Sequence, residues 1–213
     1  MNFVLERVAL PEIEPVTLTE VKRHLGEFDD ITDRDDDITA LIAAAREWVE
    51  DYTGRALIDQ SWRLTFGDAT AVDRVAGVSC DCVRSEQAGT MIYLRKSPAL
   101  SIVSFVQVAA DGGETAVDAD SYALREADGR WPRIVSLNGA AWASGEFRIV
   151  FRAGYANRDV SPADGAEVVP NRFKQAMKLW IEANYDRDKD MMQTLLDTAT
   201  GLIRSERVET GFA

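Results

Sequence analysis

The chain has 213 residues, and 46% of them are hydrophobic, which is enough for the core of one domain or of two small ones. Its formal net charge of −12 argues against an electrostatic grip on nucleic acid, because such a grip needs lysine and arginine facing phosphate. The sequence shows neither a basic, apolar leader nor the roughly 20 apolar residues of a membrane span, so we expect a soluble protein that contacts no membrane.

The first third of the chain predicts a short helix, an acidic loop and a long helix. Thr17 and Glu20 have the spacing of a capping box, which opens a helix that ends at Gly26. After the acidic loop Asp29–Asp37, the stretch Asp37–Gly54 places apolar residues at the spacing of a helix that buries one side. The same spacing places four charged residues on the opposite side of that helix: Arg46, Glu47, Glu50 and Asp51.

From Gln60 to about Tyr155 the pattern changes to that of strands. Apolar and polar residues alternate over Ser61–Phe66, which is the period of a half-buried strand. The turn signal Asp111-Gly112-Gly113 predicts a hairpin between two short strands. Further strands are predicted at Met91–Arg95, Ile102–Ala109, Ser121–Arg125, Arg133–Leu137 and Glu146–Ala153. Together these segments predict a small antiparallel β module.

Helical spacing returns in the last quarter of the chain. Pro170 suits a first helical turn, and apolar residues follow it at helical spacing as far as Tyr185. A last helix is predicted over Met192–Ile203, although Gly201 lies within it. We therefore predict an α+β fold, in which the N- and C-terminal helices form a helical bundle with the small antiparallel β module inserted. The predicted parts are residues 1–59, which begin with an extended arm or strand, then 60–156 and 157–213, with the first and last in one domain.

Three features could carry chemistry, and each has a plainer structural interpretation. Cys80 and Cys82 could form a redox pair or half of a metal site, but zinc needs a second pair of ligands, so two ordinary thiols are favoured. A calcium loop starting at Asp33 would need glycine where the chain has Ile38, so a solvated loop is favoured. His24 is the sole histidine and has no paired nucleophile, which favours a structural role. We therefore predict no enzyme, no cofactor and no metal.

Several blocks of sequence carry a resemblance to a known family. The first is PVTLTEVK at Pro15–Lys22, followed by LIAAAREWVEDYTGRAL at Leu41–Leu57 and by QSWRL at 60–64. Later blocks are VFRAGY at Val150–Tyr155 and VPNRFKQAM at Val169–Met177. These blocks resemble the head–tail connector (adaptor, head-completion) proteins of long-tailed phages, prophages and gene transfer agents. The resemblance runs from about Pro15 to Tyr185, and its first block is the most specific.

The resemblance implies a structural virion protein, made in the bacterial cytoplasm and located at the portal vertex of a phage or phage-like particle. It implies a homo-oligomeric ring, a dodecamer, beneath the portal protein, with a stopper or tail-side neck protein on the far side. DNA would pass through the bore without sequence-specific binding, and the acidic balance suits such a conduit. The C-terminal segment would reach the portal through Met191, Met192, Leu195, Leu196, Leu202, Ile203 and Phe212. The predicted ring-interface residues are Arg46, Glu50, Arg55, Arg148 and Arg152.

Two other classes of function compete with this interpretation. One is a small hydrolase built on carboxylates, which would need paired Asp or Glu side chains with perturbed pKa values in a pocket. The other is a monomeric module that uses its β face to bind a partner protein. The sequence is compatible with a ring that closes alone or only on the portal. The roles of Cys80, Cys82 and the loop Asp29–Asp37 stay open at this stage.

Overall fold

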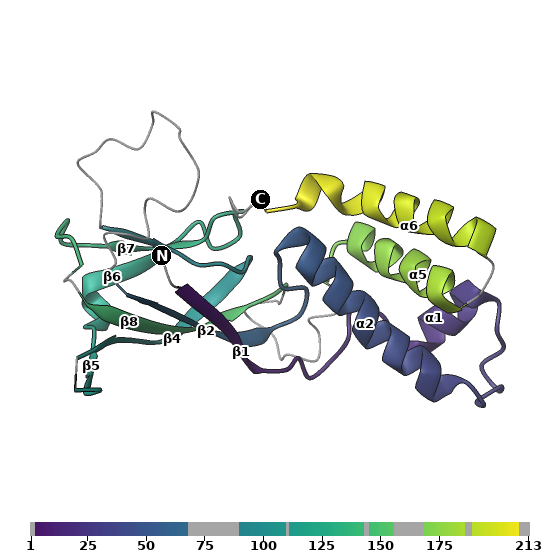
Figure 1. Cartoon of the computed structure of the whole chain (residues 1–213), viewed down its shortest axis with the longest axis horizontal. Helices are drawn as coiled ribbons and strands as arrows, with labels where there is room; N and C mark the ends of the chain where they lie inside the picture. Colours follow the sequence, from purple (N-terminus) through teal and green to yellow (C-terminus); the bar gives the residue numbers. More distant parts are fainter. Residues whose placement is uncertain are drawn as a thin grey trace. The chain divides into compact units, whose positions relative to one another are not determined.

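The chain folds into two compact units, which are coloured along the sequence in Figure 1. The computed structural model describes residues 3–67, 90–109, 111–142, 145–155, 168–185 and 189–208. The helical unit comprises Pro11–Ile58 and Tyr155–Arg207, and the β unit comprises Met1–Leu10, Asp59–Gly154 and Val208–Ala213. Each unit therefore combines segments that are far apart in the sequence.

Four helices form the described part of the helical unit: α1 (Leu18–Leu25), α2 (Asp35–Thr53), α5 (Asn171–Tyr185) and α6 (Lys189–Ile203). The predicted capping box opens α1, because the Thr17 hydroxyl accepts from the Glu20 amide and the Glu20 carboxylate accepts from the Thr17 amide. Gly54 ends α2 in the left-handed conformation, with φ of 72°, and its amide donates to the Glu50 carbonyl at 3.0 Å.

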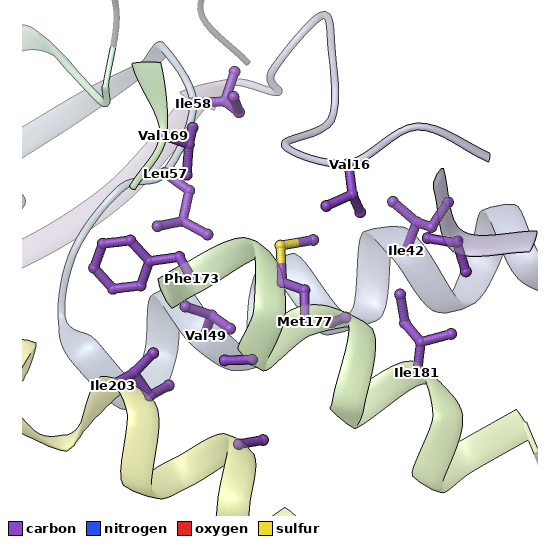
Figure 2. Packing of buried hydrophobic residues seen from close by; sticks show 14 of the residues in the cluster. Val16, Ile42, Val49, Leu57, Ile58, Val169, Phe173, Met177, Ile181 and Ile203 are labelled. Carbon is purple, nitrogen blue, oxygen red and sulfur yellow. The ribbon is translucent and has the colours of Figure 1, made fainter. Parts of the chain in front are cut away.

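The core of the helical unit lies where α2, α5 and α6 meet (Figure 2). Val49 of α2 lies against Phe173 and Met177 of α5, and Ile203 of α6 closes this cluster. All four side chains are fully buried. Burial of one such side chain contributes about 1.5–3 kcal/mol, so this contact between distant segments accounts for much of the unit's stability.

Two antiparallel sheets form the described part of the β unit. The larger has the strand order β1-β2-β8-β4-β5, and the smaller has the order β3-β7-β6. The strands of the larger sheet are β1 (Phe3–Ala9), β2 (Gln60–Gly67), β8 (Glu146–Ala153), β4 (Ala99–Val108) and β5 (Glu114–Ala116). Those of the smaller are β3 (Met91–Tyr93), β7 (Arg133–Ser136) and β6 (Tyr122–Arg125). Two 3-10 turns, η2 (Ala119–Ser121) and η4 (Arg204–Glu206), complete the described elements.

The inner face of the larger sheet is aromatic. Burial alternates along β2, so that Trp62, Leu64 and Phe66 point inward while the residues between them are half-buried. Phe66 pairs with Phe147 across the β2–β8 ladder, with ring centroids 5.7 Å apart. Phe105 of β4 extends the cluster, at 5.7 Å from the Phe147 ring. This cluster is the core of the β unit.

The predicted fold class is wrong. The described residues form two antiparallel sheets of five and three strands and four helices, and not a helical bundle with a small inserted β module. The physical reason is a long-range pairing, because the N-terminal arm forms β1 and joins β2 with Phe3 opposite Phe66. Local sequence patterns do not report which strands pair, so the size of the sheets was underestimated.

Candidate assembly surfaces

Two of the four charged residues on this side of α2, Arg46 and Glu50, belong to a buried cluster inside the helical unit. Arg46 and Glu50 are 3% and 0% exposed, so their placement on a solvent-facing side is wrong. The Arg46 Nη1 donates to Glu50 Oε2 at 3.1 Å, and its Nε donates to Glu14 Oε2 at 2.9 Å. The other oxygen of Glu50 accepts from the Leu57 amide at 2.8 Å. This cluster ties α2 to the segments before and after it.

Burial sets the electrostatics of this cluster. Desolvation raises the pKa of Glu14 above its ordinary value of 4.5, although the positive charge of Arg46 acts in the opposite direction. The carboxylate keeps its ion pair at the edge of the cluster, where the Glu14 side chain is 31% exposed. Arg46 and Glu50 thus have almost no surface to offer a second subunit, and their assignment to a ring interface stays a prediction.

Arg55, the third predicted ring-interface residue, links α2 to the C-terminal end of the helical unit. It is 5% exposed, and its Nε donates to the Glu206 carbonyl at 3.0 Å. Its guanidinium also lies 3.2 Å from the Glu206 carboxylate and 3.3 Å from the Tyr155 hydroxyl. Burial raises the pKa of Tyr155, which keeps its hydroxyl neutral beside this ion pair. Arg172 forms a second ion pair with Glu206.

Arg148 and Arg152 lie on the outer face of the larger sheet, where alternate residues of β8 are half-buried. Arg148 forms an ion pair with Glu114 of β5, and Arg152 forms a two-point ion pair with Asp59. The hydrogen bonds that the Arg152 guanidinium donates to the Asp59 carboxylate raise the pKa of Arg152. The two arginine side chains are 34% and 43% exposed, so they remain accessible to another molecule.

The predicted portal-binding residues divide into three groups along α6. Ile203 is fully buried and anchors the helix to the core. Leu195 and Leu196 are half-buried. Met191, Met192 and Leu202 are 55%, 37% and 40% exposed. Phe212 lies outside the described residues. The helix thus has one side in the core and leaves apolar side chains on the other.

Sequence reasoning missed a buried lysine that organises the acidic loop. Lys22 is 2% exposed, and its ammonium donates to the Asp29 carbonyl at 3.3 Å, to the Ile31 carbonyl, and to Asp35 Oδ1 at 2.8 Å. Three acceptors match the three donors of an ammonium group. The sequence contained one signal for this burial, because Lys22 follows Val21 on an amphipathic helix. A lysine next to the apolar side of a helix can bury its side chain.

The residues considered as catalytic or metal-binding candidates either have structural roles or lie outside the described residues. His24 pairs with Glu182 at 3.0 Å, which links α1 to α5. In the described part of the chain, no group of three or more His, Cys, Asp or Glu residues could hold a metal ion. Cys80 and Cys82 lie outside the described residues. None of the described helices is both long and apolar enough to cross a bilayer.

A cavity of about 180 Å³ lies in the β unit. Its lining comprises Gln107, Val117, Ser121, Ser136, Asn138, Ala140, Ala141, Trp142 and Phe147. No carboxylate is among these lining residues, whereas a carboxylate hydrolase needs a pair of them facing a pocket. The cavity therefore gives no support to the hydrolase interpretation.

Comparison with known proteins shows a match to one protein family in part of the chain and a similar fold in solved structures. Residues 15–80 match the family of phage gp6-like head-tail connector proteins. This match contains α1 and α2, the capping box and the buried Arg46–Glu50 cluster. No curated protein matches the chain.

The whole fold is similar to chains of solved gene transfer agent (GTA) particles. One belongs to the neck of an empty GTA particle computed with C6 symmetry, at a TM-score of 0.72 and 23% identity, covering 96% of this chain and 95% of that chain. Another belongs to the neck of the native GTA particle computed with C12 symmetry, at a TM-score of 0.70 and 22% identity, covering 96% and 94%. The family match at residues 15–80 confirms the resemblance to head–tail connectors drawn from the sequence, and the solved structures show that the fold is shared.

Proposed function

We propose that this protein is a head–tail connector in the neck of a phage-like particle, and that it acts as one subunit of a ring that joins the DNA-filled head to the tail-side neck. The observation that carries the proposal is the shared fold over 96% of the chain with neck proteins of GTA particles. Those necks were computed with C6 and C12 symmetry, which supports a dodecameric ring here.

The exposed side of α6 is the proposed contact with the portal protein. Ile203 holds the helix in the core, so Met191, Met192 and Leu202 are presented from a fixed support. Methionine side chains adapt to irregular apolar surfaces, and such residues serve well at binding faces. Phe212 and the rest of the C-terminal segment would extend the same contact.

The outer face of the larger sheet is the proposed contact between neighbouring subunits. Arg148 and Arg152 are accessible there, and each already lies beside a carboxylate that neutralises it. Arg46, Glu50 and Arg55 would support the ring indirectly, because their ion pairs fix the helical unit from within. A head-to-tail ring needs two different surfaces on each subunit, and the sheet face would supply one of them.

The role is structural, and DNA would pass through the bore without being held. The net charge of −12 supports this, because a surface of the same sign as DNA does not retain it. A stopper or tail-side neck protein would close the far side of the ring. The competing interpretation, a monomeric binding module, would use the same exposed surfaces but predicts that no ring forms.

Substitution of the exposed residues of α6 tests the portal contact. We expect Met191→Ser combined with Met192→Ser and Leu202→Ser to weaken binding to the portal ring by about tenfold or more, because apolar anchors dominate such interfaces. The matched control is Leu137→Ser, since Leu137 is 52% exposed in the β unit. Equal portal binding by the triple variant and the wild-type protein would overturn the role of α6.

A further inference from the structure

The loop between α1 and α2 presents exposed apolar side chains from a fixed backbone. We propose that this loop and the first turn of α6 form one docking surface for a partner protein that carries an apolar groove bordered by lysine and arginine. This inference deepens the proposed function and rests on it, because the portal protein is the partner to be tested. It gives the acidic loop a role that neither the family match nor the similar structures assign.

Lys22 fixes the path of the loop backbone. Its buried ammonium binds the carbonyls of Asp29 and Ile31 and the carboxylate of Asp35, so the middle of the loop and its junction with α2 are held. A buried charge is tolerated only when its donors are satisfied, and the loop therefore has to keep this conformation. A loop that is already ordered loses less conformational entropy on binding than a mobile one.

The loop lies at the same end of the helical unit as the start of α6. The Tyr185 hydroxyl binds Glu27 Oε1, and the Arg34 guanidinium lies over the Tyr185 ring, 3.8 Å from its centroid. Lys189, the first residue of α6, follows Tyr185 by four positions, which span at most about 14 Å. Figure 1 shows the α1–α2 connection and the beginning of α6 at one end of this unit.

Four large apolar side chains are exposed at this end. Phe28 is 72% exposed and Ile31 is 46% exposed on the loop, while Met191 and Met192 are 55% and 37% exposed on α6. A single exposed apolar residue is normal, whereas several on two neighbouring segments favour an interaction surface. An aromatic residue such as Phe28, held on a rigid loop, is suited to fill a pocket on the partner.

The charges around these side chains select the kind of partner. Five carboxylates are exposed on the loop and the first turn of α2, namely those of Asp29, Asp30, Asp33, Asp36 and Asp37. In the part of the chain that the structure describes, none of the five forms an ion pair. The loop is thus strongly acidic around an apolar centre, which favours a groove bordered by lysine and arginine and disfavours DNA as the occupant.

Binding to the purified portal ring at several salt concentrations tests the inference. We expect Phe28→Ser combined with Ile31→Ser to weaken portal binding about tenfold or more. We also expect binding of the wild-type protein to weaken as sodium chloride is raised, and Asp29→Asn combined with Asp30→Asn and Asp33→Asn to reduce this salt dependence. The matched control is Val103→Ser combined with Leu137→Ser, which are 59% and 52% exposed in the β unit. Unchanged far-UV circular dichroism and melting temperature verify that each variant is folded.

The outcomes separate this inference from the proposed function. If substitution of Met191 and Met192 weakens portal binding but the Phe28 and Ile31 variant binds like the wild-type protein, the docking role of the loop is overturned and the proposed function stands. If salt has no effect on wild-type binding, the basic border of the groove is overturned. If the wild-type protein does not bind the portal at all, both the inference and the proposed function fail.

Discussion

Lys22→Met removes the charge that holds the acidic loop and keeps most of the side-chain volume. Hydrogen bonds to a charged donor contribute about 1.5–3 kcal/mol each, and loss of one partner of a buried ion pair costs about 3–5 kcal/mol. Asp35 is 27% exposed and regains water, and methionine avoids the desolvation cost of the buried ammonium. We therefore expect a loss of about 2–3 kcal/mol in the free energy of unfolding, or a melting temperature lower by about 5–10 °C.

The assay combines thermal unfolding with amide hydrogen exchange. We expect faster exchange in the residues from Gly26 to Asp35 and little change in α5, because the lost hydrogen bonds lie in the loop. Lys178→Met is the matched control, since Lys178 is half-buried on α5. If Lys22→Met melts within 1 °C of the wild-type protein and its loop exchanges at the same rate, the ammonium does not hold the loop and the reasoning is refuted.

Three further predictions concern the helical unit. Glu50→Ala should lower the free energy of unfolding, measured by urea titration, by about 3–5 kcal/mol, because it leaves the buried Arg46 and the Leu57 amide without their partner. The control is Glu47→Ala at an exposed position, which should change the free energy of unfolding by less than about 0.5 kcal/mol. Gly201→Ala should raise the melting temperature by about 2–4 °C, because alanine gains about 1 kcal/mol of helix propensity over glycine. A Cβ at this position would meet no atom within 4 Å, so the added methyl group fits. A lower melting temperature would contradict this prediction. The raised pKa of Glu14 means that its carboxyl stabilises the fold below about pH 4.5 and that this contribution is lost as the pH rises through the folded pKa. As the pH rises above about 4.5, Glu14→Gln should therefore gain stability relative to the wild-type protein, and parallel curves of stability against pH would exclude a contribution from the titration of Glu14.

The helices were predictable from local signals. The capping box at Thr17 and Glu20 and the left-handed Gly54 both depend on residues within one turn, and both are present. The strand Glu146–Ala153 was predicted with its observed bounds, because a buried alternation is also a local pattern. The turn at Gly112, with φ of 84°, produces the predicted hairpin between β4 and β5.

The sheets and the buried charges were not predictable from the same signals. Pairing of β1 with β2 joins residues about 60 positions apart, and nothing in either strand specifies the other. Arg46 and Glu50 have the helical positions of a solvent-facing pair, and they are buried because Glu14 and the Leu57 amide supply partners from neighbouring segments. The same holds for Lys22, whose acceptors are carbonyls of a loop and carry no signal in the sequence.

The central claim is that copies of this chain form a ring that binds the portal protein. Its most direct test is the mass of the purified protein, alone and mixed with its portal, by light scattering, with negative-stain images of the same samples. We predict a closed ring of twelve chains, each of 23.6 kDa, in at least one of the two samples. In the sample that contains the portal protein, we predict that the two proteins comigrate. A strict monomer in both samples, without portal binding, would contradict the account.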